Sequence, residues 1–175
     1  MKATGIVRRI DDLGRVVIPK EIRRTMRIRE GDPLEIFTNN GEVIFKKYSP
    51  MGEMVSFATD LAAALSKGTE LAVAICDRER CVAVGSGGKA MLEKPITPQL
   101  EDICEQRRLF VCKDGVEVMG IQDIDQKICV AAPILAAGDI MGCIVFLESE
   151  KNASPTDQDI KLAEISAAFL SARNE

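Results

Sequence analysis

The sequence predicts an α+β protein made of two modules. A small hairpin–helix–hairpin unit spans residues 1–50, and a larger unit follows in which helices flank a central antiparallel sheet. Short β-branched runs separated by turn residues predict the strands, and apolar residues at three- and four-residue spacing predict the helices. The charge also changes sign along the chain, since residues 1–50 carry 11 Lys and Arg against 7 Asp and Glu, whereas residues 51–175 carry 12 against 20.

Composition limits the classes of function. The chain has 175 residues, 46% of them hydrophobic, and no apolar run approaches the roughly 20 residues of a membrane span. The first residues lack an apolar signal segment, so we expect a cytoplasmic protein with no membrane partner. Histidine is absent and no C-x-x-C pair occurs, which predicts no metal site, no cofactor and no histidine-dependent catalysis. We expect reduced thiols at the six cysteines, Cys76, Cys81, Cys104, Cys112, Cys129 and Cys143.

The basic part of the chain is organised around residues 14–24. Arg15 to Ile18 is β-branched and predicts a strand, which Pro19 ends. A helix is predicted over residues 20–27, with its apolar side formed by Ile18, Ile22 and Met26 and its cationic side by Lys20, Arg23, Arg24 and Arg27. Since Glu21 is the only carboxylate on this helix, the cluster favours an external anion as its partner.

The other elements of residues 1–50 are strands. We predict strands at Thr4–Ile10, Leu34–Phe37 and Glu42–Lys47. Turn residues at Asp11–Gly14 close the first hairpin, and Asn39-Asn40-Gly41 closes the second. A unit of about 50 residues without disulfides or metal buries little surface. It is therefore predicted to be an obligate dimer with strands exchanged between protomers.

Residues 4–24, with Gly31-Asp32 and Leu34-Glu-Ile36, resemble the AbrB-type swapped-hairpin DNA-binding domain. The resemblance implies an intertwined dimer that binds double-stranded DNA as a transition-state or sporulation regulator. It implies DNA contacts from the four arginines that match the family's own, Arg8, Arg15, Arg23 and Arg24. Arg9 beside them and the other helix cations, Lys20 and Arg27, complete the predicted DNA-binding set. With no dedicated reading helix, we expect recognition to depend on DNA shape more than on a strict base code.

A boundary is expected at Tyr48–Gly52, and a helix follows over residues 51–67. Its apolar stripe is Met51, Met54, Val55, Ala58, Leu61, Ala62 and Leu65, and Lys67-Gly68 ends it. We expect this helix to connect the two modules and to contribute to dimerisation.

Residues 68–175 read as strands and two further helices. The predicted strands are Leu71–Cys76, Cys81–Val84, Phe110–Cys112, Val116–Met119, Lys127–Leu135 and Ile140–Leu147. One helix is predicted at Thr97–Arg107. The last begins near Ser154-Pro155-Thr-Asp157 with Ser154 as its cap, and Leu162, Ile165 and Phe169 mark its expected buried line.

Ala132-Pro-Ile134, Gly138–Val145 and Asp157–Leu170 are similar to the second half of a GAF domain. The resemblance implies a sensor or dimerisation domain over residues 68–175, whose first helix is 51–67. With no Trp, one Tyr and no His, purine stacking and bilin attachment are disfavoured. Ala90 follows Lys89, so the glycine-rich loop before it is no phosphate loop. An apolar-walled pocket for an unidentified small molecule is instead predicted near Ser86, Gly87 and Gly88.

The leading interpretation is a DNA-binding transcription regulator that assembles as a dimer and further as a tetramer. An antitoxin-like protein-binding regulator is the alternative, although such proteins need a free tail and the C-terminal part here is predicted to fold. A thiol enzyme that reduces methionine sulfoxide would need a low-pKa thiol at Cys81, Cys104 or Cys112. No activating group stands beside any of them in the sequence, so we expect no enzyme and no catalytic residue.

Overall fold

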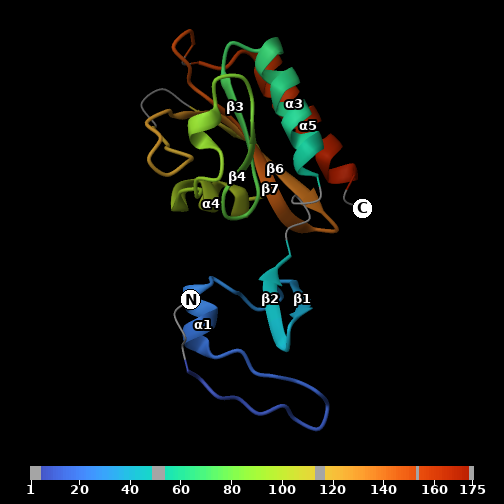
Figure 1. Ribbon diagram of the computed structural model, residues 1–175. Coiled ribbons are helices and arrows are strands. Elements are labelled where there is room, and N and C mark those ends of the chain that lie inside the picture. Colours follow the sequence, from blue (N-terminus) through green and yellow to red (C-terminus); the bar gives the residue numbers. More distant parts are fainter. Residues whose placement is uncertain (1–4, 49–53, 113–116, 153, 174–175) are drawn as a thin grey trace. The chain divides into compact units, whose positions relative to one another are not determined.

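The computed structural model describes residues 5–48, 54–112, 117–152 and 154–173. The chain forms two compact units, Met1–Tyr48 and Ser49–Glu175, and each is described by itself (Figure 1). Three positions used in the predictions above, Thr4, Met51 and Val116, lie outside the described residues, as does most of the expected boundary segment.

The first unit contains a helix and a hairpin. Helix α1 spans Lys20–Thr25, strand β1 spans Leu34–Asn39 and strand β2 spans Glu42–Lys47. The antiparallel register pairs Asn39 with Glu42, so that Asn40 and Gly41 alone form the turn, with φ of 45° and 84°. Positive φ at both central positions is typical of a type I′ turn, which confirms the hairpin predicted from Asn-Gly.

The first predicted hairpin lacks its strands. Residues 5–10 and 15–18 run without strand pairing, although a tight turn does form between Asp11 and Arg15. Figure 1 shows these residues as two arms of a long loop. Their apolar side chains are largely exposed within the described residues, since Val7 is 89% exposed and Ile10 is 70% exposed. The strand prediction is therefore wrong for one chain alone, because a two-stranded ribbon without a covering partner is marginally stable.

The second unit is built on one five-stranded sheet. In spatial order its strands are β4 (Cys81–Val84), β3 (Ala72–Cys76), β7 (Asp139–Leu147), β6 (Ile128–Ala136) and β5 (Phe110–Val111). Every neighbouring pair is antiparallel, which confirms the predicted sheet. A strand at 117–119 is not formed, since among these described residues Met119 makes only an isolated bridge to Lys127.

Helices cover both faces of this sheet. Helices α3 (Val55–Gly68) and α5 (Asp157–Ala172) lie side by side on one face, and α4 (Pro98–Glu105) lies on the other with the short 3₁₀ helix η1 (Lys89–Met91) (Figure 1). Two separate apolar clusters result, one under α3 and α5 and one under α4. Successive apolar residues in β6 and β7 supply both clusters, which explains why these strands lack polar alternation.

Helix α5 differs from its prediction in two ways. Its cap is Thr156, whose hydroxyl accepts from the N–H of Asp159 while the Asp159 carboxylate accepts from the N–H of Thr156, and Ser154 stands outside the helix. Its buried residues are Asp159, Ala163, Ser166, Ala167 and Leu170, whereas Ile165 and Phe169 are 60% and 47% exposed. The predicted buried line is therefore wrong at these two positions. Small residues face the sheet instead, because they let the helix approach it closely.

Candidate nucleic-acid interface

A carboxylate organises the turn that carries Arg15. Oδ1 of Asp11 accepts hydrogen bonds from the backbone N–H of Leu13 at 3.0 Å and of Arg15 at 2.8 Å. Oδ2 accepts from Nε of Arg15 at 2.7 Å. Gly14 adopts φ of 76°, a conformation that glycine reaches without a steric cost. The backbone N–H of Arg15, its guanidinium and the N–H of Leu13 hold the pKa of the Asp11 carboxyl below its ordinary value.

Helix α1 presents cations without burying any residue of its own. Pro19 precedes its first residue, and the N–H of Arg23 donates to the Pro19 carbonyl at 3.0 Å. Glu21 lies in the first turn, and Arg23 and Arg24 lie in the last. Acids at the start and cations at the end both interact favourably with the helix dipole. This arrangement lets the helix form with adjacent cations facing solvent.

The end of α1 places a further cation. The N–H of Ile28 donates to the Arg23 carbonyl at 2.7 Å, which closes the helix in the manner of a Schellman motif. Arg27 occupies the left-handed position of this motif with φ of 50°. Glycine usually stands there because a side chain is strained at positive φ. Arg27 thus keeps a cationic side chain at a backbone position where glycine, which has no side chain, is preferred.

All seven predicted DNA-binding residues are exposed. Lys20, Arg23, Arg24 and Arg27 share the helix and its cap, Arg15 lies on the turn, and Arg8 and Arg9 lie on the arm before it. Of the seven, Arg15 alone has an ion pair among the described residues. The other six cations have no hydrogen-bonded side-chain partner there, so their charge is available to an external anion.

Two features of this unit escaped the sequence analysis. Asp11 was treated only as a turn residue, although an Asp at the start of a turn commonly accepts a backbone N–H two residues on, as it does here from Leu13. Lys46 and Lys47 add cations on β2, where Lys46 Nζ lies 4.8 Å from the Phe37 ring centre and Lys47 Nζ lies 3.9 Å from the Asp32 carboxylate. Two consecutive lysines at the end of the predicted strand at residues 42–47 are visible in the sequence and could have revealed these cations.

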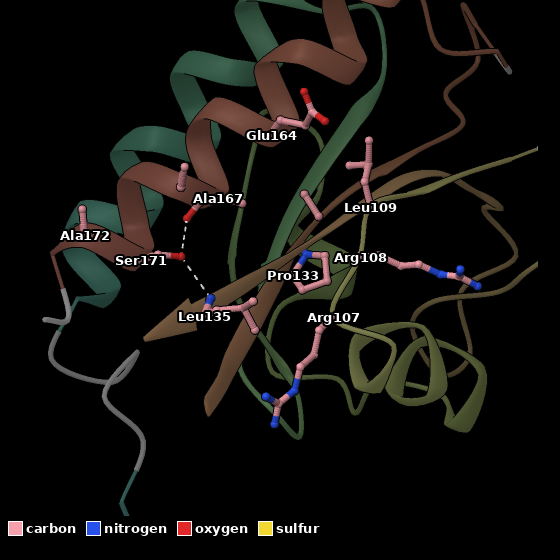
Figure 2. A pocket seen from close by; sticks show the side chains of 11 residues that line it. Arg107, Arg108, Leu109, Pro133, Leu135, Glu164, Ala167, Ser171 and Ala172 are labelled. Atoms are coloured by element: carbon pink, nitrogen blue, oxygen red, sulfur yellow. Dashed lines mark hydrogen bonds between the residues drawn. The ribbon is translucent and has the colours of Figure 1, made fainter. Parts of the chain in front are cut away.

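The second unit carries an open cavity of about 470 Å³ between α5 and the edge of β6 (Figure 2). Its wall is mostly apolar. The Ser171 hydroxyl at its side is already engaged, because it accepts from the N–H of Leu135 at 3.0 Å and donates to the Ala167 carbonyl at 2.9 Å. The lining residues are Arg107, Arg108, Leu109, Ala132, Pro133, Leu135, Glu164, Ala167, Ala168, Ser171 and Ala172.

The predicted ligand residues do not line that cavity. The N–H of Ser86 donates to the Ser66 hydroxyl of α3 at 3.0 Å, and the N–H of Gly88 donates to the Gly85 carbonyl at 3.1 Å. Gly88 also lies so close to Met91 and Val84 that a Cβ there would sit 2.9 Å from each. These contacts hold residues 85–88 as a tight turn against α3.

The thiols are mostly buried. Cys76, Cys81, Cys104 and Cys143 lie in the cluster under α4, and Cys112 is half-buried. The neighbouring Cys143 thiol and burial raise the pKa of Cys104, and burial raises the pKa of Cys129 to about 12. A raised pKa keeps a thiol protonated and disfavours nucleophilic chemistry.

No group of described residues has the arrangement of a metal site, and no described helix is long and apolar enough to cross a membrane.

Each of the two units matches a known protein family. Residues 53–175 match the family model described as stage V sporulation protein T C-terminal, transcription factor. Residues 7–52 match the model described as antidote-toxin recognition MazE, bacterial antitoxin. The chain is 48% identical to stage V sporulation protein T of Bacillus subtilis, over all of this chain and 99% of that protein.

Two further relatives match one unit each. The transition state regulatory protein AbrB of Bacillus subtilis is 60% identical over 50 residues, which are 29% of this chain and 52% of that protein. The PixJ GAF domain of Thermosynechococcus elongatus aligns with a TM-score of 0.50 at 13% identity, over 73% of this chain and 90% of that one. The second unit therefore has a GAF-like fold. The whole-chain identity and the domain match together show that the chain belongs to the stage V sporulation protein T family and is a DNA-binding transcription regulator of sporulation.

Proposed function

We propose that this regulator binds double-stranded DNA through the seven cations of its first unit, presented by an intertwined dimer of residues 1–50. The observation that carries the proposal is that most of these cations lack a hydrogen-bonded or ion-paired side chain among the described residues. Six of the seven are exposed and have no side-chain partner among the described residues, on a segment with a net positive charge. Guanidinium groups match phosphate and base edges, and two-fold symmetry would double the set.

Exposed apolar side chains support the dimer. Within the first unit nine large apolar side chains other than Met and Tyr are at least 38% exposed, and they lie on the arms, the turn and the hairpin: Ile6, Val7, Ile10, Leu13, Val16, Val17, Ile36, Phe37 and Val43. So much apolar surface is unusual for a folded monomer. A second copy is the occupant we propose, because unpaired arms of one chain can supply strands to the same arms of another.

A second self-association surface would produce the tetramer. On α5, Ile165 and Phe169 remain exposed, and the Phe169 ring lies 5.5 Å from the Phe57 ring of α3. Most of the α3 stripe instead faces the core, with Ala58, Ala62 and Leu65 buried. We therefore assign the further assembly to the outer face of the α3–α5 pair.

The experiment is a titration of DNA affinity against salt. Fluorescence anisotropy with a 30-base-pair duplex would compare the full chain with a variant in which Arg8, Arg15, Arg23 and Arg24 are changed to Ala. Each neutralised phosphate contributes about −0.9 to the log–log slope, so loss of these arginines from both protomers should reduce its magnitude by about 5 to 7. A matched control changes four exposed cations of the second unit, Lys89, Arg107, Arg108 and Lys151, to Ala and should keep the slope. A flat slope for the unmodified chain would contradict the proposal.

An antitoxin-like regulator is the second candidate, since residues 7–52 match an antitoxin model. Against it, residues 54–173 contain two packed apolar clusters and leave no long free tail among the described residues. Co-purification of a toxin with a flat salt slope would favour this candidate.

We place the protein in the cytoplasm, where a regulator meets DNA, and assign it no catalytic activity. A small-molecule ligand near Ser86, Gly87 and Gly88 stays a prediction.

A further inference from the structure

We propose that Asp11 is a positioning residue that orients Arg15 to read a guanine edge, so that Asp11 helps determine DNA specificity. The inference rests on the proposed function, because it takes Arg15 as a DNA contact. It goes beyond the expected dependence on DNA shape, since it assigns one direct base contact to each protomer.

The Asp11 carboxylate holds the turn and the guanidinium with different oxygens. Oδ1 accepts the two backbone N–H groups of Leu13 and Arg15, and Oδ2 accepts Nε of Arg15 at 2.7 Å. A guanidinium has one N–H on Nε and four on its two terminal nitrogens. With Nε engaged, the terminal nitrogens are left for an external acceptor. The Arg15 side chain is 70% exposed, so that end is accessible.

The terminal nitrogens suit a base better than a phosphate in this setting. They form two parallel donors that match N7 and O6 of guanine in the major groove. A phosphate at the same place would lie close to the Asp11 carboxylate, whose pKa is lowered by these hydrogen bonds, so it is ionised at neutral pH. Like charges repel, whereas guanine is neutral. The carboxylate therefore disfavours a backbone contact and leaves the base contact unopposed.

Asp12 provides a matched control. It carries the same charge next to Asp11, but its side chain makes no hydrogen bond or ion pair within the part of the chain that the structure describes. Removing either acid should raise the general attraction of the turn for DNA by a similar amount. Only removal of Asp11 should change which groups Arg15 contacts.

The substitution Asp11→Asn isolates the orienting contact. Asparagine keeps Oδ1, which can still accept the two backbone N–H groups that close the turn, and loses the anionic oxygen at Arg15. Arg15→Ala is a second variant that leaves the turn carboxylate intact. It removes every side-chain donor that residue 15 could present to a guanine edge, including the ammonium that a lysine would still supply. Circular dichroism of each full-length variant checks that the fold is unchanged.

The probe is 7-deazaguanine, which pairs normally but lacks the N7 acceptor. Duplexes are first selected from a random pool with the full-length protein, and guanines are then replaced with the analogue. The unmodified protein and Asp12→Asn should lose about fivefold or more in affinity for the substituted duplex. Asp11→Asn and Arg15→Ala should bind both duplexes equally, and Arg15→Ala should nearly keep the salt slope because residue 15 contacts a base rather than a phosphate.

Three results would overturn the inference. Equal binding of both duplexes by the unmodified protein would exclude a guanine N7 contact. Discrimination that persists in Arg15→Ala would place the contact on another residue, and discrimination that persists in Asp11→Asn would remove the positioning role. Absence of any DNA binding by the full chain would overturn the proposed function as well, so the two failures are distinguishable.

Discussion

Arg27 closes helix α1 in a conformation that strains its backbone. Its φ of 50° lies in the left-handed region, where a side chain other than that of glycine or asparagine is uncommon. Strain of this kind is often found at functional positions. In this unit it retains a cation one turn beyond Arg23 and Arg24, on the segment that we propose contacts DNA.

The substitution Arg27→Gly should therefore change stability and DNA binding in opposite directions. Relief of the strain should raise the free energy of unfolding by about 0.5–1 kcal/mol, after the greater chain entropy of glycine is included. Loss of one cation per protomer should reduce the magnitude of the salt slope by about 2 in a dimer. Urea denaturation and fluorescence anisotropy at one protein concentration measure the two effects. Arg27→Asn also tolerates positive φ and controls for glycine flexibility. Unchanged affinity in both variants would remove Arg27 from the interface.

At the residue scale, the sequence identified the cations but not their local partners. Exposure of Arg8, Arg23 and Arg24 follows from their charge, since charged residues stay in water. The contact between Asp11 and Arg15 depends on the turn between them, in which one carboxylate meets two backbone N–H groups and a guanidinium. Spacing alone indicates that such a pair can form, whereas the fold of the turn decides which oxygen meets which donor.

Two hairpins of this chain use the same turn with different residues. Asn40-Gly41 joins β1 to β2 with φ of 45° and 84°, and Ala137-Gly138 joins β6 to β7 with φ of 49° and 84°. Asparagine tolerates positive φ because its side chain can hydrogen-bond locally, whereas alanine has no such compensation. The β6–β7 turn is therefore less well matched to its backbone than the β1–β2 turn.

The substitution Ala137→Asn should stabilise the second unit by about 0.5–1 kcal/mol. For a unit of this size the melting temperature should rise by roughly 2–4 °C, which calorimetry of the full chain can measure. The reciprocal change Asn40→Ala should weaken the first hairpin by a similar amount and serves as the matched control. A lower melting temperature for Ala137→Asn would show that packing around this turn outweighs the backbone preference.

At the element scale, helix α5 shows where periodicity is insufficient. Three- and four-residue spacing correctly predicts a helix at this place, but it gives two apolar lines. The line through Ala163, Ala167 and Leu170 faces the sheet, while Ile165 and Phe169 face outward. Residue size alone favours the second line as the buried one. The close approach of α5 to β6 selects the smaller residues, and this approach is a property of the packed unit.

At the scale of the whole molecule, each unit exposes apolar side chains, and we propose that a further copy of the chain covers each of these two surfaces. The arms and hairpin of the first unit expose the side chains that we propose an intertwined dimer covers. The second unit has a small cluster on the outer face of the α3–α5 pair, formed by Phe57, Phe169 and Arg173. In this cluster the Arg173 guanidinium lies 4.7 Å from the Phe57 ring centre. Because the two proposed surfaces are separate, we expect that the dimer can form without the tetramer.

The substitution Ile165→Lys should convert the proposed tetramer to a dimer without unfolding the second unit. Ile165 is 60% exposed in the single chain, so a lysine there should cost little in folding, whereas a charge buried at a helix interface is strongly unfavourable. Light scattering measures the mass, and circular dichroism checks the fold. Gln122→Lys adds the same charge on an exposed loop beside the cluster under α4 and should keep the wild-type mass. An unchanged mass for Ile165→Lys would contradict the assignment.

The sequence by itself determined the two-module α+β organisation, the cationic set of residues 8–27, the Asn-Gly hairpin and the antiparallel sheet. These follow from local preferences, since charge, turn chemistry and periodicity depend on neighbouring residues. The GAF-like character of the second unit was instead implied by a resemblance to that family. Only the tertiary structure decided which line of α5 is buried and how Asp11 holds Arg15. It also decided that residues 5–10 and 15–18 have no partner strand among the described residues of their own chain. Such outcomes depend on contacts between distant groups, and strand pairing in particular requires a second backbone at hydrogen-bonding distance.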